Sequence, residues 1–557
     1  MVDELKKIIK GEILSDDDVL EKFSEDASIF KIKPALVVQP KNSTDLKNLV
    51  SFVLRKKKQG QKISLTARSA GTDMTGGPLS DSIVVDFLKH FNHIKTIKEN
   101  PKSPRAEGNG IVGHIITEPG VFYRDLEKQT LKRGLLLPSY PASKDLCSIG
   151  GMVNNNSGGE KNLLYGKTEK YVLELKVVLS DGNEYVVKPL SKKELDRKIK
   201  QKNFEGGIYR RIHNLIIKNQ KVIIAAKPNV SKNSAGYYLW NVWDGKTFDL
   251  TKLIVGAQGT LGLVTEAKLG LVKIKKHSRM VIVFLNNLEP LAGVEEKILK
   301  YKPESFESYD DKTLKLAFKF FPQMLQAMKA KNMLKMMFQF LPDAWIMLTR
   351  GFPKLVLLAE FTGDDEAQIV EHIKPLYREL QSLKVGVRVT PNEESGKKYW
   401  TIRRESFSLL RKRVKGKHTA PFIDDVIVHP EEIKEFLPKL NNILSRYKEL
   451  VYTIAGHAGD ANFHIIPLVD FSDPRFHRDI KEVSEKVYDL VAEYNGSITA
   501  EHNDGLIRTP YLKKMYKPVV LKLFKEAKDI FDPYNIFNPR KKVNGDLDYA
   551  MQHIKPN

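Results

Sequence analysis

The chain has 557 residues, 41% of them hydrophobic and 29% charged, so it is expected to fold as a globular protein of two or three domains. Its formal net charge of +23 comes from scattered lysines and arginines, without interleaved aromatic residues or a recognition motif, which argues against a nucleic-acid partner. The N-terminus lacks the apolar run of a signal peptide, and no stretch is long and apolar enough to span a membrane, so we expect a cytoplasmic location.

Cys147 is the single cysteine of the sequence. One thiol cannot form an internal disulfide and cannot hold an iron–sulfur cluster, so any electrons that this protein handles must leave through an external acceptor. Cys147 lies in an apolar-flanked stretch with no histidine nearby, which predicts a buried structural residue.

The first part of the chain predicts alternating helices and strands. Residues 1–30 predict one or two amphipathic helices. A strand begins at Ala35, and Asn42 precedes a helix over residues 46–55. Residues 63–66 predict a second strand, so this part is expected to form a small β-α-β unit.

Three glycine-rich segments lie between Ala35 and Ile274, each next to a strand-like apolar run. They cover residues 68–77, 148–159 and 256–262. A loop of this kind exposes successive backbone N–H groups, which suits a pyrophosphate. One such segment is weak evidence, because turns and bulges use the same residues, but three of them favour an extended, phosphate-bearing ligand.

The second half of the chain predicts a separate α+β domain. A strand over residues 279–285 and a helix over 291–301 are followed by a long insertion and a strand over 354–360. A helix over 517–530 leads into a tail, residues 531–542, that is rich in Pro and Asn. We find no internal repeat.

Two histidines flank a tight turn between apolar, strand-like runs. His457 and His464 enclose the sequence Ala-Gly-Asp-Ala-Asn-Phe, and Glu501 and His502 follow in a third such run. A hairpin would bring the two histidines together, and a carboxylate from a neighbouring strand would complete a two-histidine, one-carboxylate set for a divalent metal. His502 points to the other side of an extended chain, so it is available to take a proton. The alternative is that these histidines are structural, because their spacing matches no standard zinc motif.

Taken in order, these segments resemble the FAD-linked 2-hydroxyacid oxidases and dehydrogenases, a family that includes D-lactate dehydrogenases, the glycolate oxidase catalytic subunit and D-2-hydroxyglutarate dehydrogenases. The resemblance runs from Ala35 to Lys542 and implies an α+β fold. A PCMH-type FAD-binding domain of two α+β subdomains would precede a ferredoxin-like α+β cap or substrate domain. The implied boundaries are an N-terminal helical segment over residues 1–30, the FAD-binding domain over 31–275 and the C-terminal domain over 276–557.

The resemblance also implies which residues hold FAD. The first loop has no histidine in a position suited to covalent linkage, so FAD is expected to be held non-covalently. The residues implied to bind FAD are Arg68, Ser69, Ala70, Gly71, Thr72, Gly76, Gly77, Ser148, Gly150, Gly151, Asn154, Asn156, Gly158, Gly159, Gly259, Thr260, Gly262, Val264, Asn462 and Asn538.

The histidine turn resembles the metal and catalytic motifs of the same family. His457, His464 and Glu501 are implied to hold a divalent metal, zinc or manganese. His502 is implied to be the catalytic base, and Asn462 would orient either the turn or the flavin edge.

Arg403 falls where the family places an arginine for the substrate carboxylate, which a guanidinium binds through two parallel hydrogen bonds. The alternative for Arg403 is a surface ion pair, because Arg404 lies beside it. The sequence departs from the family pattern at Asn503, where a glycine commonly follows Glu-His. No lysine near Asp424 and Asp425 offers a second carboxylate contact, which disfavours a dicarboxylate substrate such as 2-hydroxyglutarate.

The implied activity is that of an FAD-dependent dehydrogenase. It would oxidise a D-2-hydroxy acid similar to D-lactate to the 2-oxo acid, with hydride transfer to flavin N5, and pass electrons to a quinone, an electron-transfer protein or oxygen. Two alternatives stay open. One is a non-dehydrogenase flavoenzyme of the same fold, similar to an ether-lipid synthase, and the other is a membrane-associated FAD-binding partner protein without catalysis.

Residues 314–341 form an insertion that is rich in Phe, Met, Leu and Lys and contains no acidic residue. Pro322 divides it and predicts a second helix over residues 323–340. A basic helix of this composition suits the interface of an anionic membrane, where quinones are found, and would give a peripheral contact with the inner face. The alternative is a cap-domain helix packed on its neighbour, with Met filling gaps.

Overall fold

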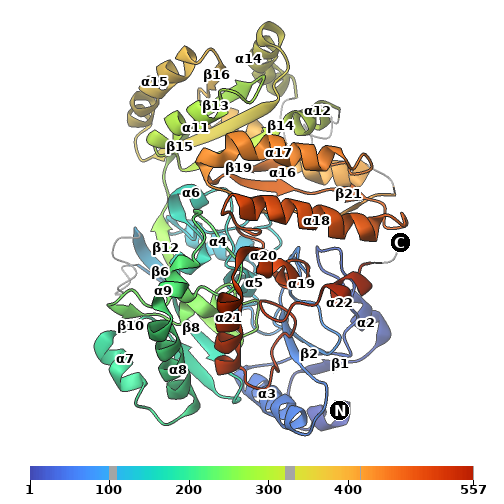
Figure 1. Ribbon diagram of the computed structural model, residues 1–557. Helices are drawn as coiled ribbons and strands as arrows, with labels where there is room; N and C mark the ends of the chain where they lie inside the picture. The colour runs from blue at the N-terminus through green and yellow to red at the C-terminus, as the bar shows by residue number, and fades with distance from the viewer. Residues whose placement is uncertain (100–109, 320–332, 414–415, 556–557) are drawn as a thin grey trace.

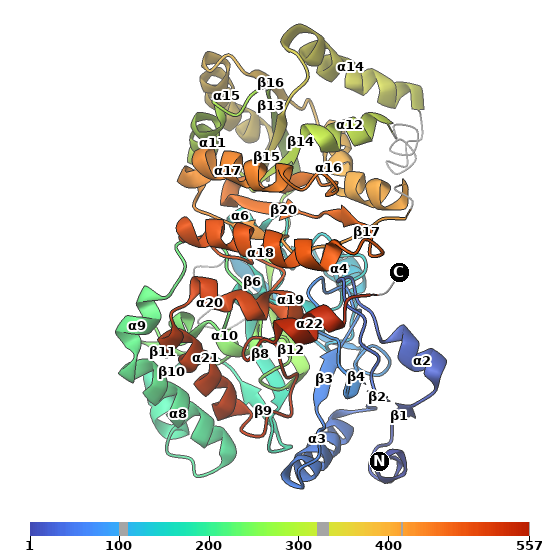
Figure 2. The same ribbon diagram turned by 45° about the vertical axis from the view of Figure 1, so that its right-hand side comes forward.

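A computed structural model describes residues 1–99, 110–319, 333–413 and 416–555. Two sheets from the first half of the chain form the lower lobe in Figure 1, and a third sheet from the second half lies above them as a cap lobe (Figures 1 and 2). The architecture confirms the predicted α+β fold, with two α+β subdomains followed by an α+β cap.

The first sheet is mixed, in the order β1-β2-β4-β3. β2 and β3 both pair parallel with β4, so the predicted β-α-β unit has a further strand between its two strands. The intervening helix begins after Asn42, whose side chain accepts the backbone N–H groups of Thr44 and Asp45, as N-cap residues do. The elements are α1 (Val2–Lys6), β1 (Glu12–Leu14), α2 (Asp17–Lys22), β2 (Leu36–Gln39), α3 (Ser43–Lys58), β3 (Leu65–Arg68) and β4 (Ile83–Asp86).

The second sheet is antiparallel, in the order β5-β6-β12-β8-β9, with β7 pairing on β12. α5 begins inside the second glycine-rich segment, and β12 follows directly from the third, so both segments lie at the ends of regular elements. The strands are β5 (Ile94–Glu99), β6 (Ile111–Thr117), β7 (Leu135–Leu136), β8 (Val172–Val178), β9 (Glu184–Val187) and β12 (Leu263–Lys273), with a small pair β10 (Leu190–Ser191) and β11 (Thr247–Phe248). The helices are α4 (Tyr123–Leu131), α5 (Ile149–Asn155), α6 (Asn162–Tyr165), α7 (Lys192–Lys198), α8 (Phe204–Lys218), α9 (Gln220–Ala225) and α10 (Thr251–Ile254).

The cap sheet is antiparallel, in the order β16-β13-β15-β14-β19-β20-β18. Successive residues of β13 face opposite sides, because side chains alternate along a strand. Val281 and Val283 join the core formed with α11 and α15, whereas Met280 and Ile282 join the core formed with α12 and α16, so helices cover both faces. The strands are β13 (His277–Leu285), β14 (Ser305–Asp310), β15 (Leu355–Gly363), β16 (Gly386–Val389), β18 (Val426–Ile427), β19 (Ile454–His457) and β20 (Asn462–Ile465), beside a pair β17 (His418–Thr419) and β21 (Leu468–Val469). The helices are α11 (Leu291–Lys300), α12 (Asp311–Lys319), α14 (Met333–Arg350), α15 (Glu366–Ser382), α16 (Glu393–Arg413), α17 (Ile433–Ser445) and α18 (Phe476–Glu493).

The last part of the chain returns from the cap to the lower lobe, where its helices lie among the N-terminal elements (Figures 1 and 2). Leu65 of β3 donates its N–H to the carbonyl of Ile536 (2.7 Å) and accepts the N–H of Asn538 (2.9 Å). Phe537 is buried in the core of the first sheet. The tail therefore completes the lower lobe rather than the cap. Its helices are α19 (Gly505–Arg508), α20 (Leu512–Met515), α21 (Pro518–Phe531) and α22 (Leu547–Gln552).

Several predicted elements differ from the structure. The sequence predicts a third strand at Glu501 and His502, but neither residue lies in a strand. Residues 1–30 contain the strand β1 as well as helices, because this segment adds to the edge of the first sheet beside β2. The helix predicted to end at residue 340 continues through Pro342 to Arg350. Asp343, inside that helix, forms ion pairs with Arg388 and Lys398, which anchor the continuation to the cap.

The predicted break at Pro322 and the predicted start of that helix lie outside the described residues. Among the residues that are described, no helix is long and apolar enough to cross a membrane. Cys147 is buried, as predicted, and burial raises the pKa of its thiol to about 12.

Candidate active site

A cavity of about 480 Å³ lies between the two lobes. The three glycine-rich segments form its lower walls, and cap strands and helix α16 form its upper wall. Of the residues predicted to bind FAD, those that line the cavity are Arg68, Ser69, Ala70, Gly71, Thr72, Gly77, Ser148, Gly150, Gly151, Asn154, Gly158, Gly159, Gly259 and Val264. The cavity is also lined by residues that were not predicted to bind FAD, among them Pro119, Cys147, Asn155, Gln258 and Thr453.

Some residues that were predicted to bind FAD lie behind the glycine-rich walls and support them. Asn538 donates its side-chain amide to the carbonyls of Gly77 (2.9 Å) and Gln258 (2.6 Å), which joins the first and third glycine-rich segments. Thr260 donates its hydroxyl to the carbonyl of Ala257 (2.7 Å) and so closes the third segment on itself. The predicted residues that do not line the cavity are Gly76, Asn156, Thr260, Gly262, Asn462 and Asn538.

The glycine-rich walls fit a large polar cofactor such as FAD. A Cβ added to Gly151 would meet only the hydroxyl of Ser148, at 3.7 Å, so the backbone there stands open to a ligand. At Gly159 an added Cβ would overlap with the carbonyl oxygen of Tyr140. The hydroxyl of Ser148 and the side-chain oxygen of Asn155 are buried and have no hydrogen-bond partner among the described residues, which leaves them available to a bound molecule.

The hairpin predicted from the two histidines is present. His457 ends β19 and His464 lies on β20, and the two strands pair antiparallel. The centroids of the two imidazole rings are 5.1 Å apart. The turn requires Gly456, because an added Cβ would overlap with the carbonyl oxygen of Asn462, and it places Ala461 in the left-handed region with a φ of 53°.

Each hairpin histidine has a carboxylate at its Nδ1 atom. Nδ1 of His457 lies 2.5 Å from Oε1 of Glu307, and Nδ1 of His464 lies 3.2 Å from Oδ1 of Asp424. A carboxylate in this position holds a proton on Nδ1 and turns Nε2 toward a metal. Burial disfavours the charged ring of His457, but Glu307 outweighs burial and raises the pKa of His457 to about 9. Metal binding would therefore displace a proton from Nε2.

Asp424 also serves His502. Oδ2 of Asp424 lies 2.6 Å from Nδ1 of His502, and the rings of His464 and His502 stack with centroids 5.1 Å apart. Burial disfavours the charged form of Asp424, but the two histidines hold its pKa well below the usual range, so the carboxylate is ionised. His502 and Glu501 both line the cavity, and their side-chain atoms approach within 4.8 Å, so the prediction that His502 points to the other side of the chain is wrong. One buried carboxylate, Asp424, contacts the rings of both His464 and His502.

Glu501 has one committed and one available oxygen. Its Oε1 accepts from Nζ of Lys232 (2.6 Å) and from Nδ2 of Asn162 (2.9 Å), two residues of the lower lobe. Its Oε2 lies 3.4 Å from Nε2 of His457. The carboxylate predicted as a metal ligand thus spans the junction between the lobes and offers a single oxygen to a cation.

Four groups with potential ligand atoms within 4.8 Å of one another are Asp425, His464, Glu501 and His502. The predicted ligands His464 and Glu501 are among them, whereas the predicted ligand His457 is not, and the predicted base His502 takes its place. Asp425 is the least suited of them to bind a cation. One of its oxygens accepts the hydroxyl of Thr499 (2.8 Å) and the backbone N–H groups of Glu501 (2.8 Å) and His502 (2.7 Å), and the other accepts from Asn462 (3.2 Å). Three of these four bonds go to one oxygen and link it to the Thr499–His502 stretch, so we assign Asp425 to holding the Glu501–His502 backbone.

Arg403 lies on α16 in the upper wall of the cavity. Its Nε atom lies 3.3 Å from Oε2 of Glu307, the carboxylate that also holds His457, and its side chain is 16% exposed. Contact through Nε leaves the two Nη groups for a ligand. Arg404 instead pairs with Glu160 through both Nε (3.1 Å) and Nη2, so the surface ion pair considered for Arg403 belongs to its neighbour.

Two family models match this chain. A model of the FAD binding domain matches residues 34–188, and a model of the C-terminal domain of FAD linked oxidases matches residues 274–542. The chain belongs to the FAD-linked oxidase family. The predicted resemblance is confirmed. The first match covers β2, β3 and β4 of the first sheet and part of the second sheet. The second match covers the cap, the histidine cluster and the tail.

Relatives of this FAD-linked oxidase are named for different 2-hydroxy acids. D-2-hydroxyglutarate dehydrogenase of Pseudomonas putida is 27% identical over 96% of this chain and 50% of its own length. Glycolate oxidase subunit GlcD of Bacillus subtilis is 26% identical over 92% of this chain and 89% of its own, and D-lactate dehydrogenase of Archaeoglobus fulgidus is 24% identical over 97% and 99%. The chain spans about half the length of several of the curated relatives that it matches.

Solved structures support the same fold. 4-Ethylphenol oxidase from Gulosibacter chungangensis superposes with a TM-score of 0.67 at 15% identity, over 98% of this chain and 97% of its own. Alkyldihydroxyacetonephosphate synthase superposes with a TM-score of 0.64 at 15% identity, over 97% of this chain and 84% of its own. At these identities the likeness shows the architecture alone.

Proposed function

We propose that this protein is an FAD-dependent dehydrogenase that oxidises a D-2-hydroxy acid similar to D-lactate to the 2-oxo acid. The observation that carries the proposal is the cluster of His457, His464, Glu501 and His502 at the cap end of a cavity whose other walls are glycine-rich. Such a cluster combines groups that can bind a cation with a group that can take a proton.

Each residue has a role that follows from its contacts. His457, His464 and Glu501 would hold a divalent cation, zinc or manganese, and the cation would supply a Lewis acid for the substrate hydroxyl. His502, oriented by Asp424 and in its neutral form, takes the hydroxyl proton on Nε2. Arg403 binds the substrate carboxylate through its Nη groups and directs the C2–H bond toward the glycine-rich walls.

FAD bound on those walls would supply the acceptor for the C2 hydride. The products are then the 2-oxo acid, reduced flavin and one proton on His502, which accounts for the two electrons lost at C2. A quinone, an electron-transfer protein or oxygen would reoxidise the flavin. A monocarboxylate fits this site better than a dicarboxylate, because Arg404, the other arginine of the upper wall, is already paired with Glu160.

The test is anaerobic bleaching of the bound flavin, followed at its visible absorption band. We expect D-lactate to bleach the flavin, with glycolate and D-2-hydroxyglutarate less efficient and L-lactate inactive. Full bleaching by dithionite with no response to any 2-hydroxy acid would overturn the proposal. That outcome would favour a transferase of the same fold or a flavin-binding partner protein without catalysis.

A further inference from the structure

The segment that carries Glu501 and His502 contacts all three glycine-rich segments. Between residues 501 and 506, its backbone donates to the carbonyl of Thr75 (2.8 Å) and to the side-chain oxygen of Gln258 (2.8 Å). It also accepts the side-chain amide of Asn155 (3.0 Å) at the carbonyl of Glu501. The proposed catalytic groups are therefore built onto the walls proposed to hold FAD, although they belong to the other half of the sequence.

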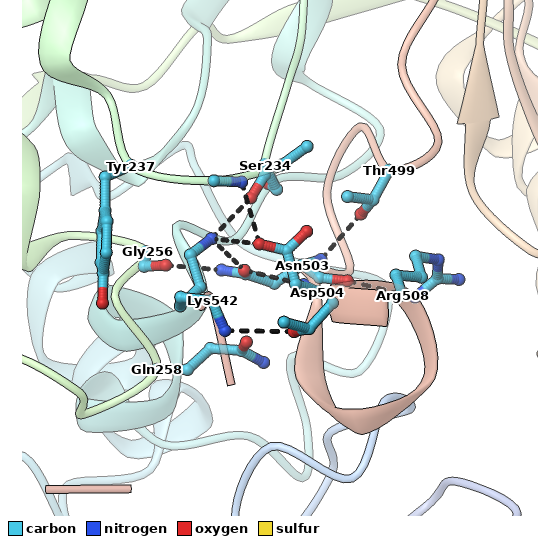
Figure 3. Close-up of polar contacts among 12 residues, drawn as sticks. Ser234, Tyr237, Gly256, Gln258, Thr499, Asn503, Asp504, Arg508 and Lys542 are labelled. Atoms are coloured by element: carbon cyan, nitrogen blue, oxygen red, sulfur yellow. Dashed lines mark hydrogen bonds and ion pairs between the residues drawn. The ribbon is translucent and has the colours of Figure 1, made fainter. Parts of the chain in front are cut away.

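Asn503 makes the most central of these contacts, as Figure 3 shows. Its side-chain amide donates to the carbonyl of Gly256 (2.8 Å) in the third glycine-rich segment and to the carbonyl of Asn155 (3.2 Å) in the second. Its side-chain oxygen accepts from Nζ of Lys542 (2.7 Å), which comes from the C-terminal tail. One fully buried side chain thus joins two walls of the cavity to the tail.

The backbone at Asn503 adopts a φ of 74°, a left-handed conformation that Asn tolerates better than most residues. Its N–H donates to the hydroxyl of Thr499 (2.8 Å), and its carbonyl accepts from Arg508 (3.2 Å). The reversal directs His502 to the cavity and Asp504 away from it, where Asp504 pairs with Lys542 (2.8 Å).

We propose that Asn503 is a positioning residue that keeps the Glu501–His502 segment in register with the second and third glycine-rich segments. FAD binding and the geometry of the histidine–carboxylate cluster are then coupled through its amide. This inference rests on the proposed function, because it assigns FAD to those segments and a metal to the cluster.

Two substitutions remove the side-chain amide of Asn503 without disturbing the turn in which it lies. Asn503→Gly suits the positive φ and removes the side chain, so the turn is retained while the bonds to Gly256 and Asn155 are lost. Asn503→Asp keeps the shape and the acceptor for Lys542 but turns an oxygen toward two carbonyls. The matched control is Asn495→Gly, because Asn495 also has a positive φ, 51°, but is exposed at the end of α18.

The first measurement is titration of the FAD-free protein with FAD. Both Asn503 variants should bind FAD about tenfold more weakly or worse, since buried carbonyls lose their donor. Asn495→Gly should bind like the unmodified protein. The visible circular dichroism of bound flavin should change in the Asn503 variants alone. Unchanged affinity and an unchanged spectrum in Asn503→Asp would overturn the proposal, whatever happens in Asn503→Gly.

The second measurement follows flavin reduction by D-lactate and determines its limiting rate and its half-saturating concentration separately. The limiting rate of flavin reduction should fall in the Asn503 variants, because His502 moves relative to the flavin. The half-saturating concentration should stay within about twofold, because Arg403 lies on α16 and is not touched. A change confined to the half-saturating concentration would contradict a positioning role.

The third measurement repeats the FAD titration after treatment with a chelator. Removal of metal should weaken FAD binding in the unmodified protein and have a smaller effect in the Asn503 variants, because coupling between two sites is reciprocal. An equal effect in all proteins would overturn the coupling. If the unmodified protein carries no metal, the metal part of the proposed function fails, whereas the comparison of FAD affinities still decides the role of Asn503.

Discussion

Oδ2 of Asp424 lies 2.6 Å from Nδ1 of His502, although the two residues are far apart in the sequence. The other oxygen of the same carboxylate lies 3.2 Å from His464. A proposed metal ligand and the proposed base therefore depend on one buried charge, and their rings stack beside it. Changes at Asp424 should disturb both roles together.

Asp424→Asn should slow flavin reduction by D-lactate by about 10- to 100-fold, the usual effect of losing a carboxylate behind a ligating or catalytic histidine. FAD should stay bound, because Asp424 does not line the cavity. Rapid-reaction absorbance would give the rate, and the absorbance ratio of flavin to protein would give the FAD content. Asp473→Asn, in an exposed pair with Arg475, is the control. A variant of Asp424 that reduces flavin at the original rate would remove it from the mechanism.

His457→Ala and Glu501→Ala should each lose metal and activity and still bind FAD, with the weakened affinity expected of the chelator-treated protein. The segment around Glu501 is held to the glycine-rich segments by its backbone atoms and by the side chain of Asn503. Neither the His457 nor the Glu501 side chain takes part in these bonds. Elemental analysis of the purified variants would measure the metal, with the exposed His429→Ala as the control. Stoichiometric metal in both variants would exclude the predicted ligand set.

His502→Ala should keep both metal and FAD and lose the proton-transfer step. Its backbone N–H, not its ring, contacts Asp425, so the turn does not depend on the imidazole. Flavin reduction in this variant should be slower at every substrate concentration, and the final spectrum on dithionite addition should be normal. A normal reduction rate would show that another group takes the proton.

The sequence predicted those parts of the site that lie in local patterns. His457 and His464 could be paired because a short turn between apolar runs forms a hairpin, and the glycine-rich segments are recognisable by composition alone. The groups that orient the histidines have no such pattern. Glu307 lies 150 residues from His457 along the chain, and Lys232 lies 269 residues from Glu501. Only the tertiary fold brings them together.

Those parts of the fold that depend on local sequence could also be predicted. The prediction failed where an element depends on residues far away in the sequence. Asn42 is the N-cap of α3, as its position before the predicted helix suggests, because capping is decided within three residues. The helix itself runs over Ser43–Lys58 and is therefore longer at both ends than the predicted residues 46–55. The strand β1 and the packing of the tail on β3 depend on partners far away in the sequence. The extension of α14 through Pro342 is stabilised by a buried ion-pair cluster that periodicity does not reveal.

Arg403→Lys should raise the half-saturating concentration of D-lactate about 10- to 100-fold with a smaller effect on the limiting rate, because an ammonium cannot make the paired contact of a guanidinium. Arg404→Lys is the matched control, since that neighbour is engaged by Glu160. Steady-state turnover with a soluble dye gives both constants. If the half-saturating concentration rises more in Arg404→Lys than in Arg403→Lys, Arg404 and not Arg403 binds the substrate carboxylate.

The last prediction concerns the exposed apolar face of α14. Leu341, Trp345 and Leu348 are 58%, 66% and 78% exposed and recur at helical spacing, so they form one stripe. The stripe borders a groove that continues over Val370 and Tyr377. The Lys residues predicted to support membrane contact, at positions 329, 331 and 335, lie where no side chains are described. The described part of α14 therefore carries an exposed apolar stripe next to the basic residues of the 314–341 segment.

We expect the protein to pellet with anionic vesicles at low salt and to be released as salt rises, because a basic segment is attracted to an anionic surface over only about a Debye length. The fluorescence of Trp345 should shift to shorter wavelength on binding. Leu348→Glu should abolish pelleting, as should Gln at Lys329, Lys331 and Lys335 together, and both variants should turn over a soluble dye normally. Ile224→Glu, at an equally apolar exposed site on α9, is the control. If the unmodified protein does not pellet at low salt, α14 serves only the cap, and the proposed contact with an anionic membrane is wrong.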